Sequence, residues 1–248
     1  MSRSAVISYV NLRMENIKGI IFDYGGTIDS HGDHWSEVIW DGYCDAGVTG
    51  VDKQVFRDAY VHGERTLAKE YHITPDDNFY QLLLKKMRIQ FDWLIANGYV
   101  SVSEASRWVE PIARYCYERA RGCADEARPV LEALAERYPM VLVSNFYGNV
   151  EAVLADFDLR KFFKTIVESA VVGVRKPDPR IFALGVEALG LEPEQVLVVG
   201  DSFRKDIEPA LSLGCQVAWL KGKGWTAEED AVSHPSIISG LSELCAIL

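Results

Sequence analysis

Three short apolar runs, each ending on a polar residue, constrain the fold of this chain most strongly. They are GIIFD (19–23), MVLVSN (140–145) and QVLVVGD (195–201). Their apolarity is continuous rather than alternating, which is typical of strands buried on both faces of a parallel sheet between helices. A fourth run, QVAWL (216–220), predicts a further strand.

Helical patterns between and after these runs predict that strands alternate with helices. The segment 178–190 follows a proline-rich turn and closes on Gly190. The segment 128–139 has Pro129 near its start and Pro139 just beyond its end, where prolines flank a separate helix. This alternation predicts an α/β fold with a doubly wound parallel sheet.

Residues 35–121 differ, because their apolar residues recur at helical spacing without a convincing strand pattern. We therefore predict a helical domain inserted between the first and second strands. The α/β core domain would comprise residues 1–34 and 122–248. The tryptophans of the insert are expected to pack in its interior.

Composition excludes several classes of partner. The 248 residues carry a formal net charge of -10 at pH 7. Nucleic acids and anionic membranes select basic surfaces, so neither is expected as a partner, and no apolar run reaches the ~18 residues of a membrane span. The five cysteines form no CxxC pair and are odd in number, which indicates reduced thiols in a cytoplasmic protein. No sequence feature specifies an oligomeric state.

Polar side chains end the three apolar runs. They are Asp23, Ser144 with Asn145, and Asp201. Ligands of open parallel sheets bind outside the carboxyl ends of the strands, so neighbouring strands would bring these side chains to one crevice. Lys176 joins the set from a turn that two prolines make rigid.

This set of residues suits phosphoryl transfer. Two carboxylates held near each other repel unless a cation lies between them, and oxygen ligands without His or Cys suit Mg²⁺. A lysine and the hydroxyls of Thr27 and Ser144 would supply donors for phosphate oxygens. A carboxylate can also attack phosphorus as a nucleophile. The set therefore predicts metal-assisted phosphoryl transfer.

The segments FDYGGT, VSN, RKPDP and GDSFRKD resemble, in this order, the four motifs of the haloacid dehalogenase superfamily. The match extends from Ile17 to the C-terminus, and the helical insert lies where this family carries its helical cap. The resemblance implies a Rossmann-like core with a helical cap domain. It also implies a Mg²⁺-dependent hydrolase, which we expect to be a phosphatase acting on a small phosphorylated metabolite.

The resemblance further implies roles for single residues. Asp23 would be the nucleophile and a Mg²⁺ ligand, and the backbone carbonyl of Gly25 would be a second ligand. Asp201 would be the third ligand, with Asp206 near the site as a further ligand or as a hydrogen-bond acceptor behind the ligands.

The same resemblance assigns the phosphate contacts. Ser144 and the Asn145 amide would hold phosphate oxygens, and Lys176 would bridge Asp23 and the phosphate. Thr27 would brace the loop.

Several of these residues also have a purely structural interpretation. Asp201 could cap a helix N-terminus, and Ser144 could belong to a turn. Lys176 could be a surface charge, and Asp206 could favour the first turns of a helix. The functional interpretation rests on their occurrence together and in order.

Gly25 departs from the family pattern, because most phosphatases of the family carry a second aspartate there. That aspartate protonates the leaving group and later activates water, a contribution of typically ~10²–10⁴-fold in rate. Gly25 is compatible with a slow phosphatase that prefers good leaving groups such as acyl or aryl phosphates. It is equally compatible with a substitute side chain, from the cap or from the nearby Asp29, His31, Asp33 and His34.

Gly25 is also compatible with a different reaction. A phosphonatase-type hydrolase would need a cap lysine as a Schiff base, with Lys53, Lys69, Lys85 and Lys86 as candidates. A dehalogenase-type hydrolase would need no metal and would carry another residue at the position of Asp201, whereas this chain keeps the aspartate. A non-catalytic phosphate- or Mg²⁺-binding regulator would need no turnover at all. Four residues could face the crevice from the side of the cap: His31, His34, Trp35 and Arg65.

Overall fold

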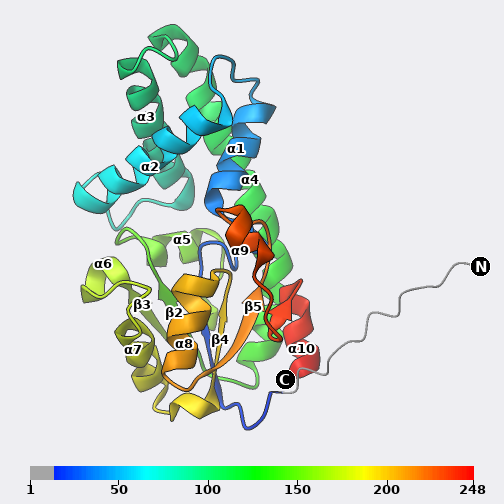
Figure 1. Ribbon diagram of the computed structural model, residues 1–248. Coiled ribbons are helices and arrows are strands. Elements are labelled where there is room, and N and C mark those ends of the chain that lie inside the picture. Colours follow the sequence, from blue (N-terminus) through cyan, green and yellow to red (C-terminus); the bar gives the residue numbers. More distant parts are fainter. Residues whose placement is uncertain (1–13) are drawn as a thin grey trace, which may run out of the picture.

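The computed structural model describes residues 14–248 and contains a six-stranded parallel sheet (Figure 1). The strands are β1 (Gly19–Phe22), β2 (Met140–Ser144), β3 (Thr165–Glu168), β4 (Val196–Gly200), β5 (Gln216–Leu220) and β6 (Ile237–Ile238). Their order across the sheet is β3-β2-β1-β4-β5-β6. The four predicted strands are confirmed as β1, β2, β4 and β5. Residues 1–13, which the sequence prediction assigns to the core, lie outside the described residues.

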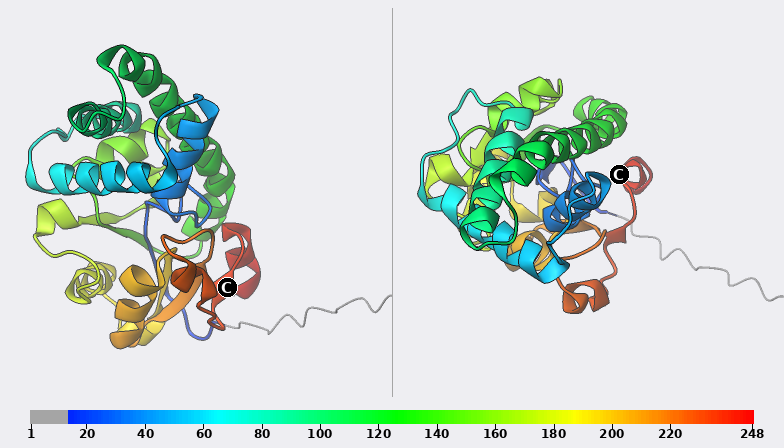
Figure 2. Two further views of the ribbon diagram at one scale, coloured as in Figure 1. Left: turned by 45° about the horizontal axis from the view of Figure 1, so that its top comes forward. Right: turned by 90° about the horizontal axis from the view of Figure 1, so that it is seen from above.

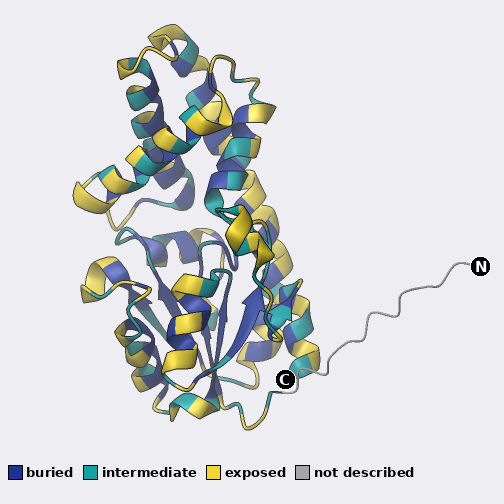
Figure 3. Cartoon of the chain, viewed as in Figure 1, coloured by how far each residue is buried: buried dark blue, intermediate teal, exposed yellow. Residues whose placement is uncertain are grey.

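The register of the central strands aligns their carboxyl ends at one edge of the sheet. Phe22, the last residue of β1, pairs with Leu142 of β2 and with Val199 of β4. Ile20 and Phe22 pack in one hydrophobic cluster and Ile21 packs in another, because successive strand side chains point to opposite faces. Both faces of the sheet are therefore buried (Figure 3).

Helices cover both faces of this sheet. The helical elements after β2 are α5 (Val150–Asp156), η1 (Arg160–Phe162), α6 (Ser169–Val172), α7 (Arg180–Leu189), η2 (Pro193–Gln195), η3 (Phe203–Ile207), α8 (Glu208–Ser212), α9 (Ala227–Ala231), η4 (Leu241–Glu243) and α10 (Leu244–Ile247). Phe182 of α7 packs in the cluster of Ile21, whereas Leu244 of α10 packs in the cluster of Phe22. The predicted end of α7 is confirmed, because Gly190 follows it with a left-handed φ of 72°.

Four helices lie between β1 and β2: α1 (Trp35–Asp45), α2 (Lys53–Lys69), α3 (Phe79–Ala96) and α4 (Val102–Ala135). Asp52, Asn78 and Ser101 begin α2, α3 and α4, because their side chains accept hydrogen bonds from first-turn N–H groups. Figures 1 and 2 show α1–α3 and the first part of α4 grouped beyond the carboxyl edge of the sheet. The predicted helical insert therefore faces the edge where the strands end.

The separate helix predicted to start near Pro129 is wrong, because α4 runs unbroken from Val102 to Ala135. A proline inside a helix leaves the carbonyl four residues earlier without its partner. Asp125 and Pro129 are both exposed, so water can satisfy that carbonyl. The predicted domain boundary at residues 121 and 122 falls inside this helix, and no break in secondary structure marks it.

Two further features bear on the expected surroundings of the protein. None of the helices described for residues 14–248 has both the length and the apolarity needed to cross a membrane. All five cysteines are free thiols in this structure, and Cys44 and Cys245 are exposed.

Candidate active site

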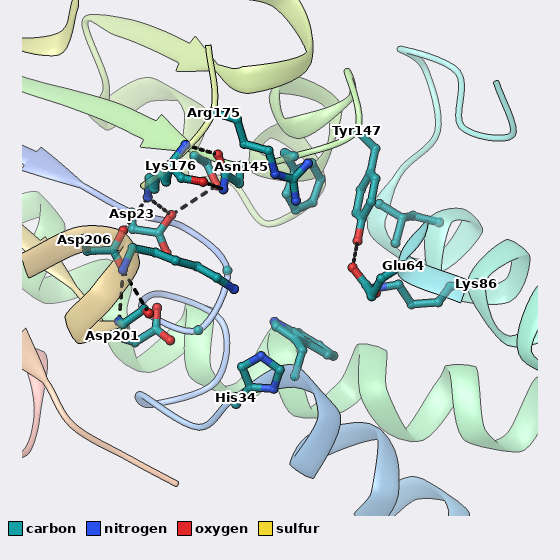
Figure 4. A pocket seen from close by; sticks show the side chains of 18 of the residues that line it. Asp23, His34, Glu64, Lys86, Asn145, Tyr147, Arg175, Lys176, Asp201 and Asp206 are labelled. Carbon is teal, nitrogen blue, oxygen red and sulfur yellow. Dashed lines mark hydrogen bonds and ion pairs between the residues drawn. The ribbon is translucent and has the colours of Figure 1, made fainter. Parts of the chain in front are cut away.

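The polar residues that end the central strands meet in one crevice, as the parallel register requires (Figure 4). Asp23 follows β1, Ser144 ends β2, and Asp201 follows β4. Lys176 reaches them from the turn before α7. Asp23, Ser144, Lys176 and Asp201 line a cavity of about 140 Å³ between the core and the helical insert.

Lys176 is buried and contacts two carboxylates. Its Nζ lies 2.6 Å from Asp23 Oδ1 and 2.7 Å from Asp206 Oδ1. Burial by itself would lower the pKa of Lys176, but Asp206 and Asp23 outweigh that effect and hold the pKa above its usual range. The surface-charge interpretation of Lys176 is therefore wrong, because only 4% of the residue is exposed.

Three carboxylates form an acidic cluster at the base of the cavity. Asp23, Asp201 and Asp206 each place an oxygen within 4.8 Å of the others. Burial, together with Asp206 and Asp23, raises the pKa of Asp201 well above its usual range. Burial also raises the pKa of Asp206, although Lys176 opposes this. Hard oxygen donors that repel one another in this way fit a divalent cation such as Mg²⁺.

The loop after β1 packs tightly on this cluster. A Cβ on Gly26 would lie 2.3 Å from the carboxyl carbon of Asp201, and Gly26 has a φ of 101°. A larger residue would therefore displace Asp201. Gly25 lines the cavity, and its carbonyl accepts no hydrogen bond from residues 14–248, which leaves this oxygen free for a ligand. Ser202, rather than Asp201, caps the following helical turn.

The side chains of Ser144, Thr27 and Asn145 form hydrogen bonds around the acidic cluster and Lys176. Ser144 Oγ lies 3.2 Å from Asp23 Oδ1 and faces the cavity. Thr27 Oγ1 lies 3.2 Å from Asp23 Oδ2 and from Asp201 Oδ1, so its contacts are those of a brace between two carboxylates. The Asn145 side chain exchanges two hydrogen bonds with the backbone of Lys176, at 2.9 and 3.1 Å. Phosphate binding by these three residues stays a prediction.

Asp29 is the nearest of the candidate substitutes for the missing aspartate, but it does not line the cavity. It accepts hydrogen bonds from the Gly26 N–H at 2.7 Å and from Trp35 Nε1 at 3.1 Å. Burial raises the pKa of Asp29 to about 7, although both donors lower it. Trp35, which donates one of these hydrogen bonds, lines the cavity, whereas Asp29 does not.

Of the other three candidates, only His34 lines the cavity. His31 faces Glu126 at 3.3 Å, and Asp33 accepts a hydrogen bond from the backbone of Lys223. His34 Nδ1 accepts a hydrogen bond from the Ser36 N–H at 3.2 Å. Burial, assisted by nearby cations such as Lys205, lowers the pKa of His34 to about 3, so this imidazole is a neutral donor through Nε2.

The insert and the loop after β2 contribute further cavity residues, and the sequence patterns singled out none of them, although Lys86 was one of four candidate cap lysines. Glu64 of α2, Lys86 of α3 and Tyr147 line the cavity and contact one another. One signal was available for Lys86. It lies seven residues after Phe79, on the apolar face of α3 that Leu82 and Leu83 share, so a charge there is buried. Arg65 lines an adjoining cavity of about 410 Å³.

Comparisons with known proteins agree with this geometry. A family model described as haloacid dehalogenase-like hydrolase matches residues 17–214. The phosphoserine phosphatase of Thermus thermophilus is 28% identical over 163 residues, which cover 54% of this chain and 63% of that protein. The chain spans less than two thirds of the length of the curated relatives that it matches.

Solved structures show the same fold. A crystal structure of a predicted phosphoglycolate phosphatase from Haemophilus somnus has a TM-score of 0.56 and 22% identity, covering 94% of this chain and 99% of that chain. A crystal structure of a dehalogenase has a TM-score of 0.61 and 15% identity, covering 94% of this chain and 98% of that chain. The fold is therefore shared by structures named as phosphatase and as dehalogenase, so the chemistry has to be argued from the site.

Proposed function

Because the chain belongs to the family of haloacid dehalogenase-like hydrolases, we propose that it is a phosphatase that acts on small phosphorylated metabolites through Asp23. The observation that carries this proposal is the buried contact of Lys176 Nζ with Asp23 Oδ1 and Asp206 Oδ1. A cation held there offsets the repulsion between the Asp23 carboxylate and an incoming phosphate, which is the main electrostatic demand of the reaction.

The reaction would proceed in two displacements at phosphorus. First, an Asp23 carboxylate oxygen attacks phosphorus and the bond to the ester oxygen breaks, so the alcohol leaves with a proton from water. Water then attacks the aspartyl-phosphate, inorganic phosphate leaves, and the carboxylate is restored. The Ser144 hydroxyl would donate to a phosphate oxygen. The backbone N–H of Asn145 is the better donor from that residue, because its side chain is occupied by Lys176.

We propose Mg²⁺ as the cofactor. The carboxylates of Asp23, Asp201 and Asp206 and the carbonyl of Gly25 are the oxygen atoms that would hold it. When bound, the ion would neutralise negative charge on the transferring phosphoryl group. Lys176, which contacts Asp23 and Asp206, would offset part of the negative charge of the three carboxylates beside the metal.

The candidate positions described above provide no proton donor for the leaving group. Gly25 supplies none, Asp29 does not line the cavity, and His34 is held neutral by its low pKa. We therefore propose that the protein prefers esters whose alcohol leaves without protonation, such as acyl and aryl phosphates, and hydrolyses alkyl phosphates slowly.

The exposed free thiols of Cys44 and Cys245 support a reducing compartment, and we propose the cytoplasm.

The structure gives no support to a phosphonatase. Of its four candidate lysines, Lys86 alone lines the cavity. Burial would lower the pKa of Lys86, but Glu64 and Tyr60 outweigh it and raise the pKa above its usual range. A Schiff base requires the neutral amine, so this lysine is poorly suited to that chemistry.

The proposal is tested by Mg²⁺-dependent release of phosphate from 4-nitrophenyl phosphate. We expect turnover in the wild-type protein and loss of at least ~10³-fold in Asp23→Asn, because the nucleophile is removed. Asp178→Asn is the matched control, since Asp178 pairs with Arg180 outside the cavity, and it should retain activity.

Two results would contradict the proposal. Turnover no higher than that of Asp23→Asn, together with no beryllofluoride adduct at Asp23, would favour a non-catalytic regulator. Chloride release from a 2-haloacid without Mg²⁺ would favour a dehalogenase instead.

A further inference from the structure

Three polar residues of the cavity form a connected bridge between the helical insert and the core. Lys86 Nζ of α3 lies 2.6 Å from Glu64 Oε1 of α2, and the Tyr147 hydroxyl donates to Glu64 Oε2 at 2.7 Å. We call Glu64, Lys86 and Tyr147 the polar bridge. Figure 4 shows Glu64 and Lys86 on the far side of the cavity from Asp23.

The polar bridge is charged but has no net charge. Burial would raise the pKa of Glu64, but Lys86 and Tyr147 lower it below its usual range. The pKa of Lys86 is raised in turn, so the carboxylate and the ammonium are both ionised and cancel each other. A buried ion pair contributes little net stability because both charges lose their hydration, so stability alone gives no reason for its position.

The position of the polar bridge matches the place of a leaving group. A phosphate ester attacked by Asp23 directs its alcohol away from that carboxylate, because the attacking and leaving oxygens lie in line. Besides the polar bridge, the residues that line the cavity include the apolar side chains of Phe79, Leu82 and Leu83 from the start of α3. The alcohol can therefore meet the donor–acceptor pair of the polar bridge next to apolar side chains.

The chemistry of the pair favours hydroxyl groups over charged groups. A hydroxyl can donate to a lone pair of Glu64 and accept from a free N–H of Lys86 while the ion pair stays closed. A carboxylate would approach Lys86 only against the repulsion of Glu64. A leaving group with both an ammonium and a carboxylate would have to open the ion pair between Glu64 and Lys86. The hydrogen bond from Tyr147 to Glu64 opposes that opening. Arg175 and Lys205, the chain neighbours of Lys176 and Asp206, also line the cavity and would be available to the phosphate.

We propose that the polar bridge recognises an uncharged, hydroxylated leaving group, so that the site prefers small polyol or sugar phosphates to phosphorylated acids. This inference rests on the proposed phosphatase function and names its substrate class. The cavity of about 140 Å³ suits an alcohol of a few carbon atoms, since pockets for drug-sized ligands have ~300–1,000 Å³. Among alkyl phosphates, which all lack a proton donor here, the preference is set by the polar bridge.

The test compares kcat/KM for glycerol 1-phosphate, phosphoglycolate and O-phosphoserine, with 4-nitrophenyl phosphate as the reference. In the wild-type protein we expect glycerol 1-phosphate to exceed the other two alkyl phosphates by roughly tenfold or more, because a site built for a hydroxyl rejects groups that leave its polar atoms unpaired. A wild-type preference for phosphoglycolate or O-phosphoserine would overturn the inference.

Two variants should move the preference in opposite directions. Glu64→Gln leaves the charge of Lys86 uncompensated, so the ratio of glycerol 1-phosphate to phosphoglycolate should fall by roughly tenfold through a lower KM for phosphoglycolate. Lys86→Gln leaves the negative charge of Glu64 uncompensated. That charge repels the carboxylate of phosphoglycolate, so the same ratio should rise. If the polar bridge only supported the fold, the two variants would shift this substrate ratio in the same direction or leave it unchanged. Either result would overturn the inference.

The control is a matched ion pair outside the cavity. Lys53 Nζ lies 2.6 Å from Glu37 Oε2 within the same insert, and Glu37→Gln should leave the substrate ratio unchanged. Failure of the phosphatase proposal would look different, because no ester, including the aryl phosphate, would then show turnover that depends on Asp23. If Glu64→Gln fails to fold, Lys86→Gln and the wild-type ratios still decide the question.

Discussion

Gly25 lies beside the nucleophile at a position where a side chain would fit. A Cβ there would meet only Trp35 Nε1, at 4.0 Å, and the φ of Gly25 lies outside the left-handed region. We expect Gly25→Asp to raise kcat/KM for alkyl phosphates by up to ~10²–10⁴-fold, because it restores a proton donor for the leaving group. Aryl phosphates should change little, because nitrophenolate leaves without a proton. Steady-state kinetics on one substrate of each kind measures the difference.

The neighbouring glycine supplies a contrast for this prediction. A Cβ on Gly26 would lie 2.3 Å from the carboxyl carbon of Asp201, so Gly26→Asp should lose activity towards every substrate. Unchanged rates for alkyl phosphates in a correctly folded Gly25→Asp protein would show that another group already transfers the proton.

The residues of the core site were predictable because each belongs to a segment that fixes its position. Asp23, Ser144 and Asp201 end or follow neighbouring parallel strands, and Lys176 sits in a turn with two prolines. The polar bridge was not predictable, because its members come from α2, α3 and the loop after β2. They meet only when the insert packs on the core, and no local sequence pattern records that contact.

Among the elements, α4 connects the two parts of the molecule without interruption. It packs against α1 and α3 of the insert and against η4 and α10 of the core. Gly122 lies within α4, is exposed, and has no atom within 4 Å of a Cβ built on it. Gly122→Ala should therefore raise the free energy of unfolding by ~0.5–1 kcal/mol, because glycine loses more backbone entropy in a helix than alanine does.

Thermal unfolding measures this effect, which corresponds to roughly 1–4 °C in Tm for a chain of this size. The expected kcat is unchanged, because α4 spans insert and core as one continuous helix. A stabilised Gly122→Ala protein with a strongly reduced kcat would show instead that the insert moves about residue 122. The contrasting variant is Gly42→Ala in α1, whose Cβ would press on Ile112 and Tyr115 at 3.2 Å and should destabilise the protein.

The same elements show which parts of the fold the sequence predicted. The buried strands β1, β2, β4 and β5 were found because both faces are covered and their apolar runs are continuous. The edge strands β3 and β6 were missed because β6 has two residues and β3 is only partly buried, so neither presents such a run. The extent of α4 was misjudged because Gly122 and Pro129 interrupt helices on average, whereas the packing of α4 on both parts of the molecule overrides that tendency.

At the scale of the whole molecule, the acidic cluster opposes folding unless a cation offsets it. Asp23, Asp201 and Asp206 outnumber Lys176, and all four are held between the sheet and the insert. Because the pKa of Asp201 is raised in the folded state, its contribution to stability is fully present below the unfolded pKa of about 3.8 and is lost as pH rises above that value. The metal-free protein should therefore lose stability as the pH rises.

Saturating Mg²⁺ should reverse this loss, because an ion that binds only the folded state stabilises it by about 2.7 kcal/mol at 100 times Kd, or roughly 5–10 °C in Tm. The shift in Tm should be larger at pH 8 than at pH 5, since at pH 8 more of the Asp201 carboxyl is ionised and repels its neighbours. Asp201→Asn should raise the Tm in EDTA and remove most of the Mg²⁺-dependent shift, whereas Asp178→Asn should leave both values unchanged. Differential scanning calorimetry with EDTA or Mg²⁺ gives all of these values. A Tm that Mg²⁺ leaves unchanged at pH 8 would mean that the cluster binds no divalent cation, and Lys176 would then be the principal counter-charge for the phosphate.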